Sequence, residues 1–122
     1  MNKNKYQALY EFYNTFGIPA YEENSVPEDA ELPYITYEIM TADLDMENIA
    51  MSCQIYFKSN SLMKVNAITE KLYNALQGGL KLKCDTGYIV LYRGRPFAQN
   101  RPSGDKTVKA KYINISADYI TK

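Results

Sequence analysis

The side chains that most often carry chemistry are scarce in this chain. Its 122 residues include no histidine and only two cysteines. Histidine is the commonest general base near neutral pH and the commonest ligand of transition metals. Cys53 and Cys84 each sit in a strand-like apolar run, so we interpret them as small buried side chains, with a disulfide or a reactive thiol as the alternatives. We therefore expect a protein that is not an enzyme and holds no metal or cofactor.

Two short motifs resemble ligand-binding loops, but the end of a helix and the tip of a hairpin explain them better. Gly78-Gly79 follows a helical pattern, so it predicts the end of a helix and not a phosphate-binding loop, which precedes one. Residues 42–48, ADLDMEN, space Asp43, Asp45 and Glu47 as a calcium loop would. They lack the glycine and the late glutamate of such loops. We interpret this segment as the acidic, solvent-exposed tip of a hairpin.

The charges of the chain cancel overall but are divided between its two halves. Residues 6–57 contain ten acidic residues and no lysine or arginine. Residues 58–122 contain twelve basic residues and four acidic ones. Opposite charges on two regions of one chain suit a head-to-tail contact between identical subunits, and such contacts can close into rings.

A cluster of cations in the second half is the strongest candidate for a binding surface. Its members are Arg93, Arg95, Arg101, Lys106, Lys109 and Lys111, and Asp105 alone opposes them. The cluster could be a solvated surface, a protein interface or a nucleic-acid site, because Lys and Arg neutralise phosphates while aromatic rings stack on bases. The chain has 12 tyrosines. Tyr6, Tyr10 and Tyr13, however, share the apolar face of a predicted helix, where core packing explains them.

The elements that must position these residues begin with two amphipathic helices. The first is predicted over residues 3–15, with an apolar face at helical spacing; that face comprises Tyr6, Leu9, Tyr10, Tyr13 and Phe16. The second follows a cap at Ser59 or Ser61; its apolar stripe comprises Leu62, Val65, Ile68, Leu72, Tyr73 and Leu76. Gly78-Gly79 ends it.

The remaining pattern predicts strands. Residues 34–41 and 49–58 alternate apolar and polar side chains and form a hairpin through ADLDMEN, and residues 80–84 and 88–92 form a second hairpin. Residues 18–21 could add a short extended piece. Residues 93–106 contain two prolines and two glycines, which predicts a loop. In the last strand Ile113, Ile115, Ala117 and Tyr119 point inward, and we expect a bulge or a change of partner near Tyr112.

Together these elements predict one α+β domain over residues 1–122, a mainly antiparallel sheet with two helices on one face. No apolar run is long enough to cross a bilayer, and the first residues lack the pattern of a signal peptide. We therefore expect neither membrane insertion nor export.

The order of elements resembles the tail terminator family of long-tailed bacteriophages, with related minor tail and head-tail joining proteins of prophages. Four features carry the resemblance. They are an N-terminal helix, LPYITYEI after an acidic loop, AMSCQIYFKSNS running into the helical LMKVNAITEKLYNAL, and a C-terminal VKAKYINISADYITK. Together they span nearly the whole chain.

The resemblance implies a structural protein that forms a ring, commonly a hexamer, on the end of the tail tube. Such a ring ends tail growth and joins the tail to the head. The implied partners are other copies of the chain, the major tail tube protein and head-completion proteins, with no small-molecule substrate and with DNA at most passing through the ring. Asp43, Asp45, Glu47 and the cation cluster would then be subunit or tube contacts. The implied location is the host bacterial cytoplasm during assembly and then the virion tail.

Overall fold

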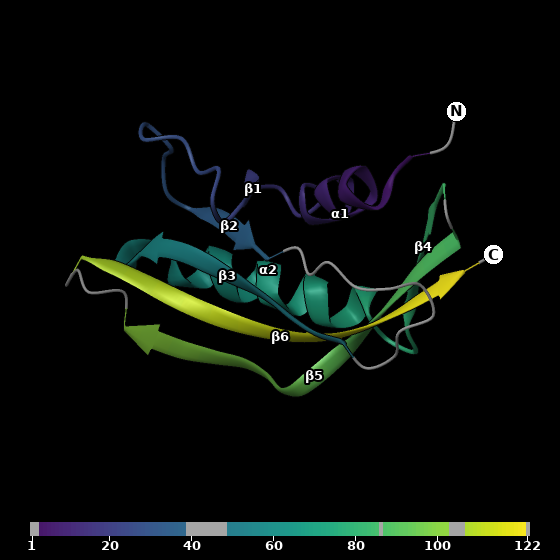
Figure 1. Cartoon of the computed structure of the whole chain (residues 1–122). Coiled ribbons are helices and arrows are strands. Elements are labelled where there is room, and N and C mark those ends of the chain that lie inside the picture. Colours follow the sequence, from purple (N-terminus) through teal and green to yellow (C-terminus); the bar gives the residue numbers. More distant parts are fainter. Residues whose placement is uncertain (1–2, 39–48, 86, 103–106, 122) are drawn as a thin grey trace.

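The chain forms a curled six-stranded sheet that holds two helices against its concave face (Figure 1). The computed structural model describes residues 3–38, 49–85, 87–102 and 107–121. This architecture confirms the expected α+β class. Neither helix in the described part of the chain is long and apolar enough to cross a membrane.

Both predicted helices are present. Helix α1 spans Lys5–Tyr13 and begins with a capping box, in which the backbone N–H of Gln7 donates to the side chain of Asn4 and the Asn4 N–H donates back. Helix α2 spans Leu62–Ala75 and follows a 3₁₀ turn, η1, at Ser59–Ser61. Ser61, one of the two predicted capping residues, is the N-cap residue of α2, although its side chain makes no capping hydrogen bond.

The strands are β1 (Ala20–Glu22), β2 (Tyr34–Tyr37), β3 (Ile49–Lys58), β4 (Leu80–Cys84), β5 (Gly87–Pro102) and β6 (Val108–Thr121). Their order in the sheet is β1-β2-β3-β6-β5-β4. Strand β1 runs parallel to β2, and every other neighbouring pair is antiparallel. The sheet is therefore mainly antiparallel, as expected. Strands β4 and β5 form the predicted second hairpin.

One hydrophobic core fills the space between the sheet and the helices. Alternate residues of β3 and β6 face it, as predicted; they are Met51, Cys53, Ile55 and Phe57 of β3 and Ile113, Ile115, Ala117 and Tyr119 of β6. From α2, Val65, Ile68 and Leu72 are at most 3% exposed. Burying each such aliphatic side chain contributes about 1.5–3 kcal/mol. Both cysteines are buried and free, and burial raises the pKa of Cys53, which confirms the small-side-chain interpretation.

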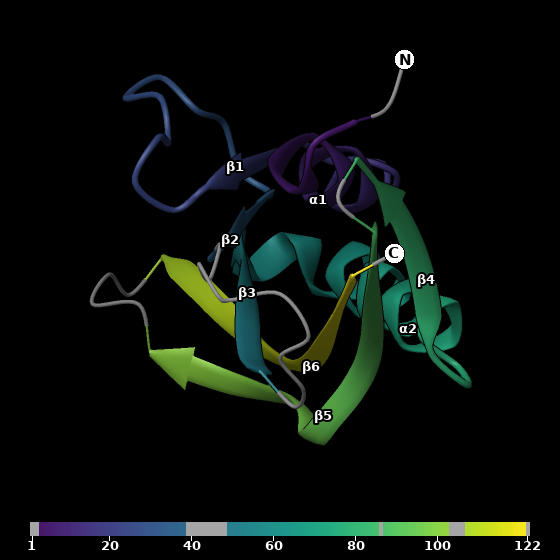
Figure 2. The ribbon, with the colours of Figure 1, turned by 45° about the vertical axis from the view of Figure 1, so that its right-hand side comes forward.

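Helix α1 closes the open side of the curled sheet. It contacts both β1 and β4, which are the two outermost strands of the sheet order (Figure 2). At one end the Asn14 side chain accepts from the backbone N–H of Ala20 at 3.0 Å and donates to its carbonyl. At the other end the N–H of Asp85 donates to the carbonyl of Lys3. The helix thus ties the two edges of one sheet together.

The predicted apolar face of α1 is confirmed for Leu9, Tyr13 and Phe16, which are buried, and is wrong for Tyr6 and Tyr10. Tyr6 and Tyr10 are 46% and 52% exposed, whereas Ala8 and Phe12 are buried. The predicted and observed stripes both have helical spacing and share Leu9, Tyr13 and Phe16, so periodicity alone does not separate them. The sheet decides, because Tyr13 stacks on Tyr37 of β2 and Phe12 packs edge-on against Tyr13 and Phe16 on the same side of the helix. A tyrosine tolerates exposure because its hydroxyl group remains in water.

The predicted loop at residues 93–106 is wrong for its first part, because β5 continues to Pro102. The pairing with β6 is interrupted between Arg93 and Ala98, where Gly94–Phe97 bulge out opposite Asn114. It then resumes from Ala98 to Pro102. Pro96 stands in the bulge and Pro102 ends the strand, two positions where a sheet tolerates proline. The bulge expected in β6 near Tyr112 is therefore in the neighbouring strand, since β6 pairs with β3 without a break.

Candidate interface between α2 and β5

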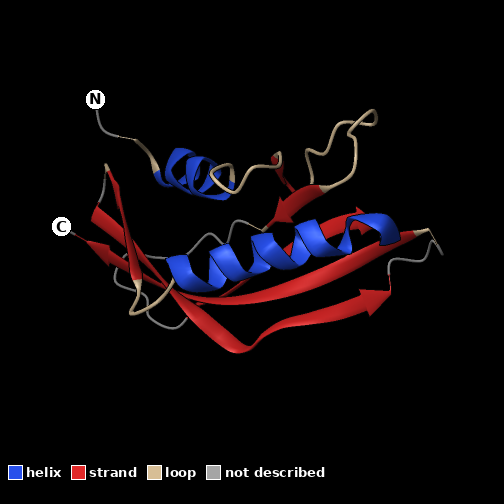
Figure 3. Ribbon diagram, turned by 180° about the vertical axis from the view of Figure 1, so that it is seen from behind, coloured by secondary structure: helices blue, strands red, loops and turns tan. Residues whose placement is uncertain are grey.

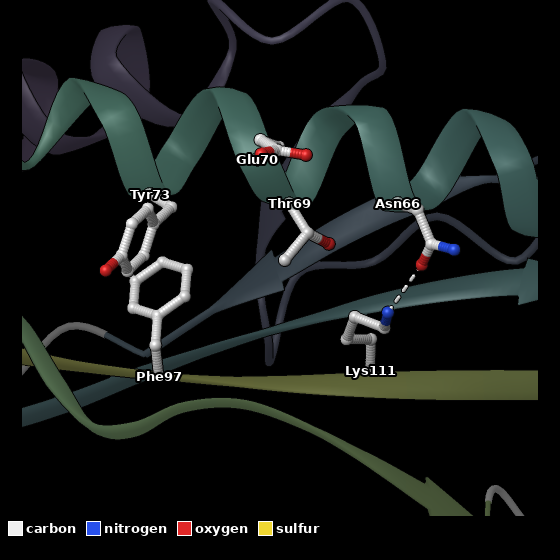
Figure 4. Close-up of a pocket in the computed structure, with 6 residues that line it drawn as sticks. All are labelled: Asn66, Thr69, Glu70, Tyr73, Phe97 and Lys111. Carbon is white, nitrogen blue, oxygen red and sulfur yellow. Dashed lines mark hydrogen bonds between the residues drawn. The ribbon is translucent and has the colours of Figure 1, made fainter.

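Helix α2 presents a second row of side chains beside its buried stripe. Asn66, Thr69, Glu70 and Tyr73 lie three, four and seven residues apart, so they share one side of the helix. Asn66, Thr69 and Tyr73 point toward the strands, and Glu70 lies further from them (Figure 4). Thr69 donates its hydroxyl hydrogen to the carbonyl of Val65, which directs that side chain along the helix. This row forms one wall of a groove.

The bulge in β5 and the neighbouring strand β6 form the opposite wall. Phe97, at the end of the bulge, packs edge-on against Tyr73 with ring centroids 5.3 Å apart. Lys111 pairs with Ile55 across the sheet and so points to the same face as the core. Its Nζ donates to Oδ1 of Asn66 at 2.6 Å. Together these side chains line a groove of about 300 Å³, which we call the α2–β5 groove.

Arg93 fixes the aromatic end of the α2–β5 groove. Its Nε donates to the backbone carbonyl of Tyr73 at 2.8 Å, and its guanidinium carbon lies 3.5 Å from the centroid of the Tyr73 ring. A cation over an aromatic face contributes about 0.5–1 kcal/mol at exposed sites. Tyr73 is held between Arg93 and Phe97, yet 41% of its surface remains exposed. The groove therefore carries a rigid aromatic group that is open to a partner.

A free sheet edge borders the same groove. Strand β4 pairs with Gly87–Leu91 only, so among the described residues no strand lies beyond Ala98–Pro102 of β5 (Figure 3). Gln99 and Asn100 give this stretch a polar character. An unpaired strand edge is a ready site of protein contact unless something covers it.

The electrostatic character of this region is positive. Arg93 and Lys111 flank the groove, and Arg95 and Lys109 are exposed nearby on β5 and β6, with Glu70 as the carboxylate that lines the groove. Within the described residues the ion pair that forms is between Lys3, which precedes α1, and Glu11 of α1, and neither residue lines the groove. The basic side chains of the groove are therefore available to a partner's carboxylates or phosphates.

An acidic surface lies at the other edge of the sheet. Exposed carboxylates follow β1 in the chain; they are Glu23, Glu28, Asp29 and Glu31. Burial, and then the like charges of Glu38 and Glu22, raise the pKa of the Glu23 carboxyl. Like charges are thus held close together here, and among the described residues no lysine or arginine forms an ion pair with them, a condition that a basic partner would relieve.

The structure brings together part of the predicted cation cluster. Arg93 and Lys111 border the groove, Lys109 is exposed beside it, and Arg95 stands exposed in the β5 bulge. Arg101 lies in the paired second half of β5, and its side chain is not described. Asp43, Asp45, Glu47 and Lys106 lie outside the described residues.

Sequence reasoning missed the aromatic half of the groove. The apolar pattern places Tyr73 in the apolar stripe of α2, and the prolines and glycines of residues 93–106 place Phe97 in a loop. The signal that could identify Tyr73 is its spacing from the polar Asn66 and Glu70, which places it at the border of the apolar stripe. Nothing local identifies Phe97, because its position depends on the pairing of β5 with β6.

Two other pockets have no lysine or arginine among the described residues that line them. One, of about 460 Å³, is lined by Tyr6, Gln7, Tyr10, Glu11 and Tyr37. The other, of about 300 Å³, lies on the helix-free side of β2 and β3 and is lined by Glu23, Asn24, Val26, Tyr34, Thr36, Gln54 and Tyr56. No group of three or more His, Cys, Asp or Glu side chains in the described part of the chain could hold a metal ion.

Comparison with models of protein families, with curated proteins and with solved structures gave no match. The functional argument therefore rests on the residues and on their arrangement.

Proposed function

We propose that this chain is a structural protein of a long-tailed bacteriophage or prophage. In this proposal it assembles with copies of itself as a ring at the end of the tail tube, ends tail growth and joins the tail to the head. It acts by assembly and not by catalysis. It is made in the host bacterial cytoplasm and becomes part of the virion tail.

The observation that supports self-assembly best is the α2–β5 groove. Aromatic residues and arginine are enriched at the energetically important centres of protein interfaces. Here Tyr73 is held in place by Arg93 and Phe97 before any partner binds, so little conformational entropy is lost on association. The free edge of β5 adjoins it, and a surface of opposite charge lies elsewhere on the same chain.

The assignment to a phage tail rests on the resemblance of the four quoted segments, and the α+β fold is compatible with it. Electron microscopy of purified tail tubes mixed with the protein tests this part. We expect density at one tube end and tubes that no longer elongate. A protein that forms no oligomer and also ignores the tubes contradicts the proposal.

Substitution in the groove tests whether it is the assembly surface. Tyr73→Ala removes the exposed aromatic group, so we expect the apparent dissociation constant of the oligomer to rise at least tenfold, measured by light scattering over a dilution series. Met63→Ala is the matched control, because Met63 is 87% exposed on the same helix but lies outside the groove. Equal loss in both variants would argue against the groove.

Nucleic-acid binding is the second candidate, and the pairing of aromatic and basic side chains in the groove is the observation that favours it. Bases could stack on Tyr73 while Arg93 and Lys111 neutralise phosphates. The Glu70 carboxylate on the same wall opposes phosphate binding. A single-stranded oligonucleotide that binds with steep salt dependence, lost in the Arg93→Ala, Arg95→Ala and Arg101→Ala variant, would support this candidate over self-assembly.

A further inference from the structure

We propose that the α2–β5 groove receives the acidic β1–β2 connection, residues 23–33, of a second copy of the chain. This inference rests on the proposed self-assembly and names the two surfaces that meet. It accounts for charges of opposite sign that form no ion pair among the described residues.

The β1–β2 connection is shaped to present its carboxylates. The N–H of Ser25 donates to the carbonyl of Glu22 at 2.8 Å, and the N–H of Ala30 donates to the carbonyl of Pro27 at 3.1 Å. These turns leave Glu28, Asp29 and Glu31 exposed. Because the backbone is already held by hydrogen bonds, docking would cost less ordering entropy than docking of an unstructured segment.

The receiving surface has the complementary charge. Arg93, Arg95, Lys109 and Lys111 surround the groove and the free edge of β5, and only Glu70 on its lining is acidic. Complementary potentials across an interface select the partner and its orientation. A carboxylate-rich loop is therefore the segment of this chain that fits the groove best.

The two surfaces lie on either side of α2, at the same end of the molecule (Figures 1 and 3). Strands β3 and β6 separate β2 from β5 in the sheet. One copy therefore offers its loop to a second copy while receiving the loop of a third. Contacts of this head-to-tail kind propagate and close into a ring when the rotation between copies allows it.

Extension of the sheet through β1 is not the mode of contact. The outward N–H and carbonyl of Ala20 are both bonded to the Asn14 side chain, and the carbonyl of Glu22 accepts from Ser25. These groups are not free to pair with β5 of another copy. The carboxylates of the β1–β2 connection, which are exposed, remain to make the contact.

Two charge-reversal variants, each measured alone and then mixed with the other, test the proposal. The loop variant carries Glu28→Lys and Asp29→Lys, and the groove variant carries Arg95→Glu and Lys109→Glu; all four side chains are exposed. Each variant alone brings like charges together at the substituted positions, so we expect self-association at least tenfold weaker than that of the natural chain. In an equimolar mixture, an alternating assembly again joins opposite charges at the substituted positions of every contact. We expect the mixture to associate within about threefold of the natural chain.

The control is Lys71→Glu with Lys83→Glu, which reverses two exposed lysines away from the groove and should leave association unchanged. Circular dichroism of each variant checks that it folds. All proteins are compared under a condition in which the natural chain assembles, alone or on tail tubes.

Variants that assemble like the natural chain, or a mixture that fails to restore association, would overturn the loop-to-groove contact and leave self-assembly standing. A natural chain that assembles under no condition overturns both proposals.

Discussion

The hydroxyl group of Tyr13 is the least satisfied polar group in the core. The side chain is fully buried, and its oxygen has no hydrogen-bond partner among the described residues. Its ring stacks on Tyr37 at 4.6 Å with an interplanar angle of 16°. Burial also raises the pKa of the phenol well above its usual value, so the group stays neutral. Tyr13 therefore contributes packing while its hydroxyl group opposes folding.

Removal of that hydroxyl group should stabilise the protein. Tyr13→Phe keeps the stacked ring and deletes an unpaired buried polar atom, whose desolvation costs about 1–3 kcal/mol. We expect the free energy of unfolding to rise by about 1 kcal/mol in urea denaturation. Tyr13→Leu serves as the comparison, because it also removes the aromatic stack and should be destabilising. A loss of stability in Tyr13→Phe would show that the hydroxyl group has a partner.

The carboxyl group of Glu23 makes stability depend on pH. Its pKa is raised in the folded chain by burial and by Glu38 and Glu22. A raised pKa means that the folded state holds the proton more tightly, so the stabilising contribution is present in acid and is lost as the pH rises through the folded pKa. At neutral pH the ionised group therefore opposes folding.

Glu23→Gln should consequently increase stability at pH 7. The gain is at most about 0.5 kcal/mol, because the side chain is exposed and solvent screens its charges. Thermal unfolding measured from pH 3 to pH 8 should show the two proteins converging in acid and separating as the pH rises. Asp85→Asn, an exposed carboxyl group on the β4–β5 turn, is the control. A gain that is largest in acid would contradict this account.

At the scale of elements, the β5 bulge determines the shape of the groove. It contains Gly94, where an added Cβ would lie 2.6 Å from the backbone carbonyl oxygen of Asn114. The side chain of Asn114 also donates to the carbonyl of Pro96 at 2.7 Å, which holds the bulge against β6. The position of Phe97 follows from this close approach.

Gly94→Ala should therefore disturb both the fold and the groove. The added methyl group meets backbone, which moves only with the strand, so we expect a loss of about 1–3 kcal/mol in the free energy of unfolding. Asn100→Ala is the matched control, since that side chain is exposed on the same strand, and it should change stability by less than about 0.5 kcal/mol. Equal stability of Gly94→Ala and the natural chain would show that the bulge can shift freely.

The same elements show what sequence patterns can and cannot predict. Alternation identified the inward residues of β3 and β6, and glycines marked the end of α2, because those signals are local. The second half of β5 was missed since its prolines and glycines are typical of loops, and only the partner β6 makes the stretch a strand. The face of α1 was misjudged because Tyr6 and Phe12 fit alternative stripes of the same period. The groove joins these nonlocal features, so charge predicts its Lys111 and the bordering Arg93 but not the aromatic Tyr73 and Phe97.

At the scale of the whole molecule, the fold separates two surfaces of opposite charge. The sheet carries the acidic β1–β2 connection toward one edge and the basic β5 toward the other, while α1 closes the core between them. A chain with zero formal net charge can still associate through such surfaces, because local potentials and not the net charge govern the encounter. High salt should weaken that association, since exposed charges are screened.

Sedimentation velocity over a dilution series at low and high salt is the most direct test of self-assembly, the central claim here. One chain has a mass of 14.0 kDa. We predict species at multiples of this mass at low salt, with the dissociation constant rising as salt is added, either for the protein alone or for the protein with tail tubes. A 14.0 kDa species at every concentration and salt, with no binding to the tubes, would contradict the account.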